Sequence, residues 1–376
     1  MKKPIVIIIL FIFTVSISFA QRQKSDSIKY DEIGIEVPPE ILKRKPDDPY
    51  RVGYIETQKD RTRNRTLLDL ALNYSPLSYV SGGYLDPFHP KKKPYILDAD
   101  VSPQFAIGGE WLKFPILITP RYLVRIFGDD AKAGDYSEPV RTPSFMPGAT
   151  IFIPLQDTIT PYTKKVLFGS LAVFHHSNGQ DGWEFSAPGV FNKYNGNFST
   201  DYIEPAFWFR KRYGGDKSIC PDYPGARDGY FDWFTKISYQ IYFSTDDVLA
   251  PSYGSGKINI STGLVRVFNY EDHYGGTSKT PFNAPYYAER YRLLFNLCYI
   301  TGARTLGLDR FDKRFGSEAS FHFKIPSSPN TALMLTAGYY GSDPYNIYYA
   351  DSYFYVRAGI STGLFVAPAR RKIIDK

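Results

Sequence analysis

The sequence has little of what metal centres, disulfide scaffolds and nucleotide sites require. It holds only two cysteines, Cys220 and Cys298, and five histidines. An exported protein could pair the two cysteines, but one lies in a Pro/Gly/Asp-rich stretch and the other in an apolar one. We therefore expect two free thiols. Neither residue type has the spacing of a zinc site, and no phosphate-binding loop or dinucleotide motif occurs.

Long hydrophobic runs are also missing beyond residue 20, where no apolar stretch approaches the ~20 residues of a membrane helix. Residues 1–20 have the pattern of a secretory signal: Lys2 and Lys3, an apolar core over 5–13, and a small-residue cleavage site after Ala20. An N-terminal anchor helix is the alternative. The net charge of +7 is modest and dispersed, and nothing in it suggests a nucleic-acid partner.

Aromatic residues, by contrast, are abundant, with 31 Tyr and 28 Phe making up most of a 17% aromatic content. Soluble domains rarely carry so many. Membrane β-barrels do, because aromatic side chains form girdles at both lipid–water interfaces. The composition therefore favours an exported barrel in the bacterial outer membrane.

Strand-like segments recur between turn signals from about residue 95. In the last of them, Phe354, Val356 and Ile360 share one face, and Tyr355 and Arg357 share the other. We predict an all-β fold, an antiparallel transmembrane β-barrel of about 12 strands, although a soluble β-sandwich shows the same alternation. The predicted strands are 96–112, 116–127, 149–155, 165–176, 202–212, 231–244, 257–270, 291–300, one around Arg304, 318–324, 332–341 and 352–366.

Four regions follow from this interpretation. Residues 1–20 are the signal, 21–66 a charged and partly disordered N-terminal extension, 67–366 the barrel, and 367–376 a basic tail. Residues 67–80 are apolar and are expected to pack against the barrel. We predict no helix beyond the signal.

The candidate site lies where the apolar strand 166–174 runs into His175, His176 and Ser177. Side chains alternate along a strand, so His175 and Ser177 share a face with the aliphatic residues upstream. A serine becomes a useful nucleophile only when an adjacent base takes its proton. The pattern therefore indicates a nucleophile–base pair on a lipid-facing wall. Two polar residues at a strand end, without chemistry, are the alternative.

His175-x-Ser177-Asn178-Gly179 resembles the active-site motif of the outer-membrane phospholipase A family. The segment from Ser137 to Thr142 is similar to that family's Ser-x-Pro loop, and Tyr339-Tyr340-Gly341-Ser342 with the last strand resembles its closing hairpin. The resemblance spans residues 67–366. It implies a twelve-stranded barrel on whose outer wall phospholipid acyl esters are hydrolysed, with A1 and A2 specificity, by a calcium-bound homodimer.

The resemblance also implies roles for individual residues. Ser177 is the expected nucleophile and His175 the general base, and the amide of Gly179 is expected to stabilise the oxyanion. The expected Ca²⁺ ligands are the carbonyl of Gln180, the hydroxyl of Ser186, and Ser137 of the partner chain. Gln180 replaces the family's usual Arg, and the loop to Ser186 is one residue longer than usual.

An asparagine is expected to orient the base, and two candidates stay open. Asn192 matches the family's Trp-Asn-Arg motif by residue type, whereas strand phase favours Asn197. We prefer Asn197, because Asn192 would require a strand too long for a bilayer. The function predicted is a calcium-dependent outer-membrane phospholipase A. The alternatives are a non-catalytic porin-like or structural barrel and a soluble secreted β-sandwich lipase.

Overall fold

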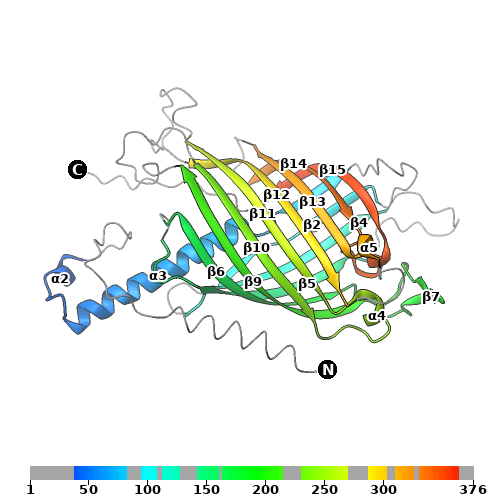
Figure 1. The fold of residues 1–376 in the computed structure, drawn as a ribbon, viewed down its shortest axis with the longest axis horizontal. Coiled ribbons are helices and arrows are strands. Elements are labelled where there is room, and N and C mark those ends of the chain that lie inside the picture. The colour runs from blue at the N-terminus through cyan, green and yellow to red at the C-terminus, as the bar shows by residue number, and fades with distance from the viewer. Residues whose placement is uncertain are drawn as a thin grey trace.

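A computed structural model describes residues 38–82, 95–107, 112–127, 142–160, 163–214, 230–269, 287–302, 310–325 and 330–363. Its strands form a closed antiparallel barrel of twelve strands, with β2 and β3 as two pieces of one interrupted strand (Figure 1). The barrel closes where β1 pairs with β15 on one side and with β2 on the other, and β2 pairs with β4. The predicted fold class is therefore confirmed.

The strands follow chain order around the barrel. The first six barrel segments are β1 (Ser78–Gly82), β2 (Leu97–Val101), β3 (Phe105–Ile107), β4 (Ile116–Ile126), β5 (Ser144–Pro154) and β6 (Lys165–Ser177). A small hairpin follows, β7 (Phe185–Ala187) with β8 (Val190–Phe191). The remaining strands are β9 (Ser199–Gly214), β10 (Tyr230–Tyr242), β11 (Gly256–Asn269), β12 (Tyr287–Thr301), β13 (Phe315–Lys324), β14 (Thr331–Tyr340) and β15 (Tyr353–Thr362).

Most predicted strands correspond to observed ones, with two differences. β1 was missed, because its five residues are too short to show a period. The predicted first strand is split into β2 and β3. The strand predicted around Arg304 includes residues outside the described part of the chain.

The barrel wall is apolar outside and polar inside, as the alternation predicted. On β15, Phe354 and Ile360 are exposed, whereas Tyr355 and Arg357 are buried in the interior. Asp98, for example, is an interior carboxylate that forms an ion pair with Arg125 at 3.0 Å and another with Arg357. A closed sheet leaves no unpaired strand edge in lipid, so this wall belongs to a multi-pass outer-membrane barrel.

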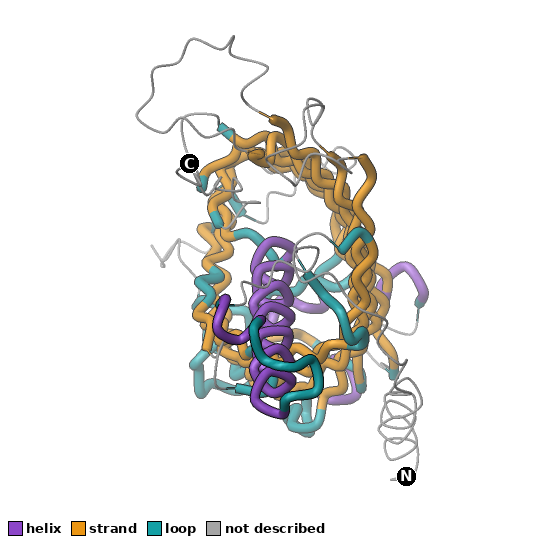
Figure 2. The backbone as a smooth tube through the Cα atoms, turned by 90° about the vertical axis from the view of Figure 1, so that its left-hand side faces the viewer, coloured by secondary structure: helices purple, strands orange, loops and turns teal. Residues whose placement is uncertain are grey.

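A long helix, α3 (Pro49–Tyr74), enters one end of the barrel and lies inside the ring of strands (Figure 2). The Asp48 side chain caps its start by accepting a 2.8 Å hydrogen bond from the Tyr50 amide, and Pro49 occupies the first turn. At its other end, Tyr74 stacks on Phe234 and donates a 2.7 Å hydrogen bond to Asp232.

The last third of α3 is anchored by apolar packing against the barrel interior. Its buried residues recur at helical spacing, and they form one core with side chains from β4, β5, β6, β9, β10 and β11. The helix contributes Leu67, Leu70, Ala71 and Tyr74, and the barrel contributes Leu117, Phe152, Val166, Phe168, Ala206, Trp208, Tyr230, Phe234, Val265 and Val267, together with Ile159 of the β5–β6 connection.

This helix corrects the prediction that no helix follows the signal. It begins within the region 21–66, predicted to be partly disordered, and crosses the expected domain boundary at residue 67. The signal (1–20), the first part of that region (21–37) and the basic tail lie outside the described residues. Charged residues between 51 and 65 masked the pattern, although the apolar spacing from 67 to 74 is that of one helical face.

The opposite end of the barrel is covered by loops and short helices. The short helices are α4 (Ala250–Tyr253), α5 (Phe311–Arg314) and the 3₁₀ helix η2 (Asn346–Ala350), and α2 (Pro39–Leu42) precedes α3. Aromatic side chains from η2, α4 and the β8–β9 region form a second core there. Its main members are Phe191, Phe198, Tyr253, Tyr345, Tyr348 and Tyr349.

None of the helices in the described ranges is long and apolar enough to cross a bilayer.

Cys298 forms no disulfide within the described part of the chain. Cys220 lies outside it, so the expectation of two free thiols stays a prediction for that residue.

Candidate active site on the outer wall of the barrel

Strand β6 carries its aliphatic residues and the candidate pair on the outer wall. Leu171 and Val173 are 43% and 51% exposed, and the His175 side chain, next on that face, is 42% exposed. Residues of the other phase, Phe168 and His176, are buried inside. The shared outward face predicted for His175 and Ser177 is therefore what the fold contains.

His175 is held by a carboxylate on the neighbouring strand. Its Nδ1 lies 2.7 Å from Oδ1 of Asp201, and the two residues are directly opposite each other in the β6–β9 pairing. A carboxylate at Nδ1 fixes the tautomer in which Nδ1 carries the proton, and it leaves Nε2 as the basic nitrogen. Asp201 thus gives His175 the orientation that a general base requires.

Ser177 is half-buried at the end of β6, with Ser199 of β9 opposite it and Phe145 of β5 on its other side. The described residues include no hydrogen bond between Ser177 Oγ and the His175 ring. Such bonds are often long without substrate and tighten in the reacting complex. Residues two apart on a strand point the same way, so the hydroxyl and the free Nε2 share one face.

The turn after Ser177 is fixed from inside by Asn178, a buried residue. Its Nδ2 donates to the carbonyl of Gly196 at 2.8 Å, and its Oδ1 accepts from the amides of Phe198 and Gln180 at 3.1 and 3.2 Å. Gly179 follows with φ +66°, a left-handed conformation that favours glycine. Gly179 is exposed, so its amide lies in a rigid turn at the barrel surface.

The β8–β9 connection beside this turn is tied to the loop between β14 and β15. Lys193 Nζ contacts both carboxylate oxygens of Asp351 at 2.5 and 2.6 Å, and Tyr348 donates its hydroxyl to the Lys193 carbonyl at 3.2 Å. Phe191 packs edge-on against Tyr349. Segments far apart in the sequence therefore support the turn next to Ser177.

Neither predicted asparagine meets the His175 ring. Asn192 Nδ2 donates instead to the carbonyl of Trp183 and to Oδ1 of Asn195. Asn197 lies before β9, where its backbone amide bonds to the carbonyl of Gly182. Asp201, which does contact the ring, has the same strand phase as Asn197 and lies four residues further along the chain. Only the folded pairing shows which of these positions faces His175.

The predicted calcium ligands are only partly within the described chain. Gln180 lies in the turn after Ser177, and its amide bonds to Asn178. Ser186, on β7, is exposed and donates to the carbonyl of Val190 across the hairpin at 3.3 Å. Ser137 lies outside the described residues. The donors present are oxygens of the type calcium takes, although no cluster of three acidic, His or Cys side chains occurs in the described ranges.

Comparisons with known proteins give a fold likeness and no family. No protein-family model matches the chain, and none of the curated proteins matches it. Among solved structures, an active-site mutant of outer membrane phospholipase A from Escherichia coli is similar at 11% identity and TM-score 0.47, over 81% of this chain and 98% of that one.

Two other solved structures are similar over most of their length. The calcium-bound dimer of outer membrane phospholipase from Salmonella typhi has 12% identity and TM-score 0.44, over 81% of this chain and 98% of that one. A loop-deletion mutant of OmpT from Vibrio cholerae has 9% identity and TM-score 0.22, over 76% and 96%. At these identities the likeness concerns the barrel alone.

Proposed function

We propose that this chain is an outer-membrane phospholipase A that hydrolyses acyl esters of glycerophospholipids at both the A1 and A2 positions. The observation that carries the proposal is the 2.7 Å contact between His175 and Asp201 beside Ser177, on a wall whose neighbouring side chains are exposed aliphatics. A diacyl lipid in the bilayer would meet this wall directly. A water-soluble substrate would not.

In the proposed mechanism, Asp201 holds the ring so that Nε2 accepts the proton of Ser177 as the hydroxyl attacks the ester carbonyl. The imidazolium that forms is stabilised by the carboxylate, and it then protonates the leaving alcohol. A second cycle with water releases the fatty acid. The amide of Gly179 donates to the developing oxyanion, which is where such donors contribute most.

We further propose that calcium and a homodimer complete the site. The Gln180 carbonyl and the Ser186 hydroxyl are the ligands this chain offers in its described part, with Ser137 supplied by a partner subunit. When bound there, calcium would supply positive charge near the oxyanion. The exposure of Ser186 supports this proposal, because its oxygen keeps a lone pair free beyond its bond to Val190.

A diffusion channel is the competing function, and the interior argues against it. Helix α3 packs against the barrel wall through a buried apolar core at one end, and aromatic side chains from three loops pack together at the other. A porin needs a water-filled path instead. A purely structural barrel remains the alternative that the experiment must separate.

The test uses the full-length chain purified in detergent and assayed for fatty acid release from phospholipid micelles, with calcium or with EDTA. We expect Ser177→Ala to lower release by at least about 10³-fold, because the nucleophile is lost. We also expect EDTA to abolish wild-type activity and added calcium to restore it. Ser199→Ala is the matched control, since it removes a hydroxyl opposite Ser177 on the same face.

A sulfonyl fluoride adds a readout that does not depend on the lipid chosen. Only an activated serine reacts readily with it, so we expect Ser177 to be labelled in the wild type. Undiminished lipid hydrolysis by Ser177→Ala would sink the proposal.

A further inference from the structure

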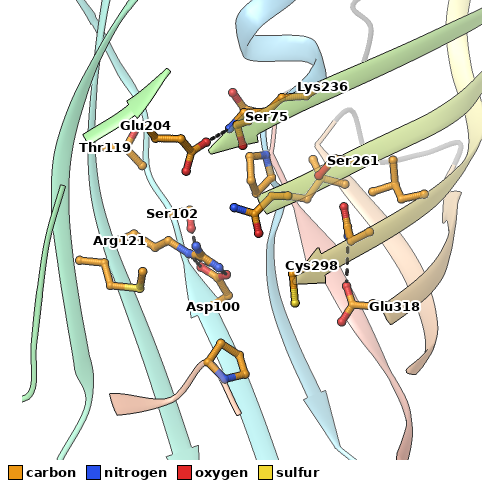
Figure 3. Close-up of a pocket in the computed structure, with 18 of the residues that line it drawn as sticks. Ser75, Asp100, Ser102, Thr119, Arg121, Glu204, Lys236, Ser261, Cys298 and Glu318 are labelled. Carbon is orange, nitrogen blue, oxygen red and sulfur yellow. Dashed lines mark hydrogen bonds and ion pairs between the residues drawn. The ribbon is translucent and has the colours of Figure 1, made fainter. Parts of the chain in front are cut away.

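The barrel interior contains a cavity of about 430 Å³. Its lining includes Tyr74, at the end of α3, and Tyr253 of α4. Side chains from facing strands point into it: Figure 3 shows Arg121 beside Asp100, and Glu204 with Lys236. It lies on the inner side of the wall whose outer side carries His175 and Ser177. Nothing in the proposed hydrolysis uses it.

Almost all of the positive charge in the cavity wall is neutralised by acidic partners. This holds for each cationic side chain there except one. The pairs are Arg121 with Asp100, Lys236 with Glu204, Arg125 with Asp98 and Asp343, and Arg357 with Asp98 and Glu318.

The exception is Lys257, at the start of β11. Its side chain lines the cavity, whereas Ile258 and Ile260 of the same strand point outward and are exposed. Among the described residues, no carboxylate pairs with its ammonium group. Lys257 is half-buried, so its ammonium group can take an anionic partner from the cavity that it lines.

His176 supplies the second unmet group. It is only 3% exposed and lines the same cavity, and its Nε2 is buried with no hydrogen-bond partner in the described chain. His322, the other buried histidine of the cavity wall, differs in that its Nδ1 lies 2.8 Å from Ser361 Oγ. Buried polar atoms are normally satisfied by protein, water or a ligand.

Both unmet groups lie near Tyr253 of α4. The His176 ring packs edge-on against Phe198 with ring centroids 4.8 Å apart, and Phe198 in turn packs against Tyr253 at 5.3 Å. Lys257 follows Tyr253 by four residues, at the start of β11.

Arg121 bonds Asp100 through Nε and Nη2, and its Nη1 has no hydrogen bond among the described residues. Arg121 is paired with Met146, and the preceding Phe145 is paired with Ser177, so Arg121 and His176 lie on the same stretch of the inner wall. This part of the cavity therefore brings together three nitrogen donors and a net positive charge.

We propose that this part of the cavity binds a small oxyanion of the phosphate or carboxylate class, held by the Lys257 ammonium group and a donor N–H at His176 Nε2. The ligand comes from the aqueous phase, because the barrel wall separates the cavity from the bilayer lipids. Arg121 Nη1 offers a third hydrogen bond. The site goes beyond the proposed hydrolysis and does not require it to be correct.

The experiment measures binding of inorganic phosphate to the full-length barrel in detergent by isothermal titration calorimetry. We expect saturable binding that weakens at least tenfold in Lys257→Met and in His176→Phe. The phenylalanine keeps an aromatic ring against Phe198, which lies 4.8 Å away, and removes only the nitrogens. Lys165→Met is the matched control, because Lys165 is an exposed lysine on the same strand as His176.

Folding of each variant is checked by the gel shift between heated and unheated barrel. Lys257→Gln replaces Lys257→Met where the latter does not fold. Competition by sulfate or acetate supports the oxyanion class. Absence of saturable phosphate binding by the wild type, or equal affinity in Lys257→Met and Lys165→Met, would overturn the proposal. Either result can be read whether or not Ser177 proves catalytic.

Discussion

At the scale of single residues, the candidate site depends on one cross-strand pair. Asp201 faces His175 because the β6–β9 register sets these two positions opposite each other. Directly opposed residues on one face of a sheet are near enough for their side chains to meet. An acidic orienter also differs from the asparagine that the resemblance implied, and its negative charge would stabilise the imidazolium as well as position the ring.

We predict that Asp201→Ala lowers kcat for phospholipid hydrolysis by roughly 100-fold or more, since an unoriented histidine is a poor base. Asp201→Asn keeps an oxygen that accepts from Nδ1, so its loss should be smaller. The measurement is steady-state release of fatty acid at saturating calcium.

Asn192→Ala and Asn197→Ala are the controls, and both should stay near wild-type kcat. Neither side chain has a hydrogen bond to the His175 ring among the described contacts. An inactive Asn197→Ala together with an active Asp201→Ala would return the orienting role to the asparagine predicted from sequence.

At the scale of elements, α3 occupies one end of the barrel interior. Its exposed N-terminal half is charged, and its last turns carry the apolar face that contacts the barrel interior. Tyr74 adds a hydrogen bond to Asp232, which Arg212 also contacts at 2.8 Å. The helix is therefore fixed by apolar burial and by an internal polar network.

Leu67→Ala should lower the free energy of unfolding by about 2–5 kcal/mol, because Leu67 is fully buried and the change leaves a cavity. Urea unfolding in detergent, followed by tryptophan fluorescence, measures the difference. Trp208 reports on this core, as it stacks on Phe168 at 5.5 Å.

Val52→Ala is the control on the same helix, since Val52 is 40% exposed, and its effect should be within about 0.5 kcal/mol. Equal effects of the two substitutions would mean that α3 does not pack inside the barrel in solution.

At the scale of the whole molecule, a closed wall separates two environments. Exposed leucine, isoleucine, valine and phenylalanine side chains cover the outside of every long strand, while arginine, aspartate and glutamate are paired inside. This arrangement suits a barrel in lipid, where outward charge is costly and inward charge can be neutralised by partners or water.

Leu335→Arg should therefore destabilise the barrel in lipid vesicles by about 2–4 kcal/mol, the cost of a charge on the lipid face near the midplane. Leu335 is 55% exposed in the middle of β14. The free energy of folding into vesicles is measured by urea titration. Phe311→Arg is the control, because Phe311 is 68% exposed on α5, outside the strands, and it should change that free energy little.

The sequence by itself indicated the strands and the outward face of the candidate pair. Both depend on alternation with period two, which is local: the phase of Leu171 and Val173 continues to His175 and Ser177 without knowledge of any other strand. Alternation alone also fits a β-sandwich, and the aromatic content is what favoured a barrel. Local alternation and turn signals were likewise enough to predict the strands that correspond to β4, β6 and β9–β15.

Only the tertiary structure decided what His175 touches, what lies inside the barrel and which charges on the cavity wall are paired. Asp201 meets His175 through a strand register. Helix α3 is stable because six strands bury its apolar face, and no carboxylate of the described residues pairs with Lys257, since those nearby on the cavity wall pair with other cations. Each of these depends on contacts between residues distant in sequence, and a pattern along one strand carries no information about which strand lies beside it.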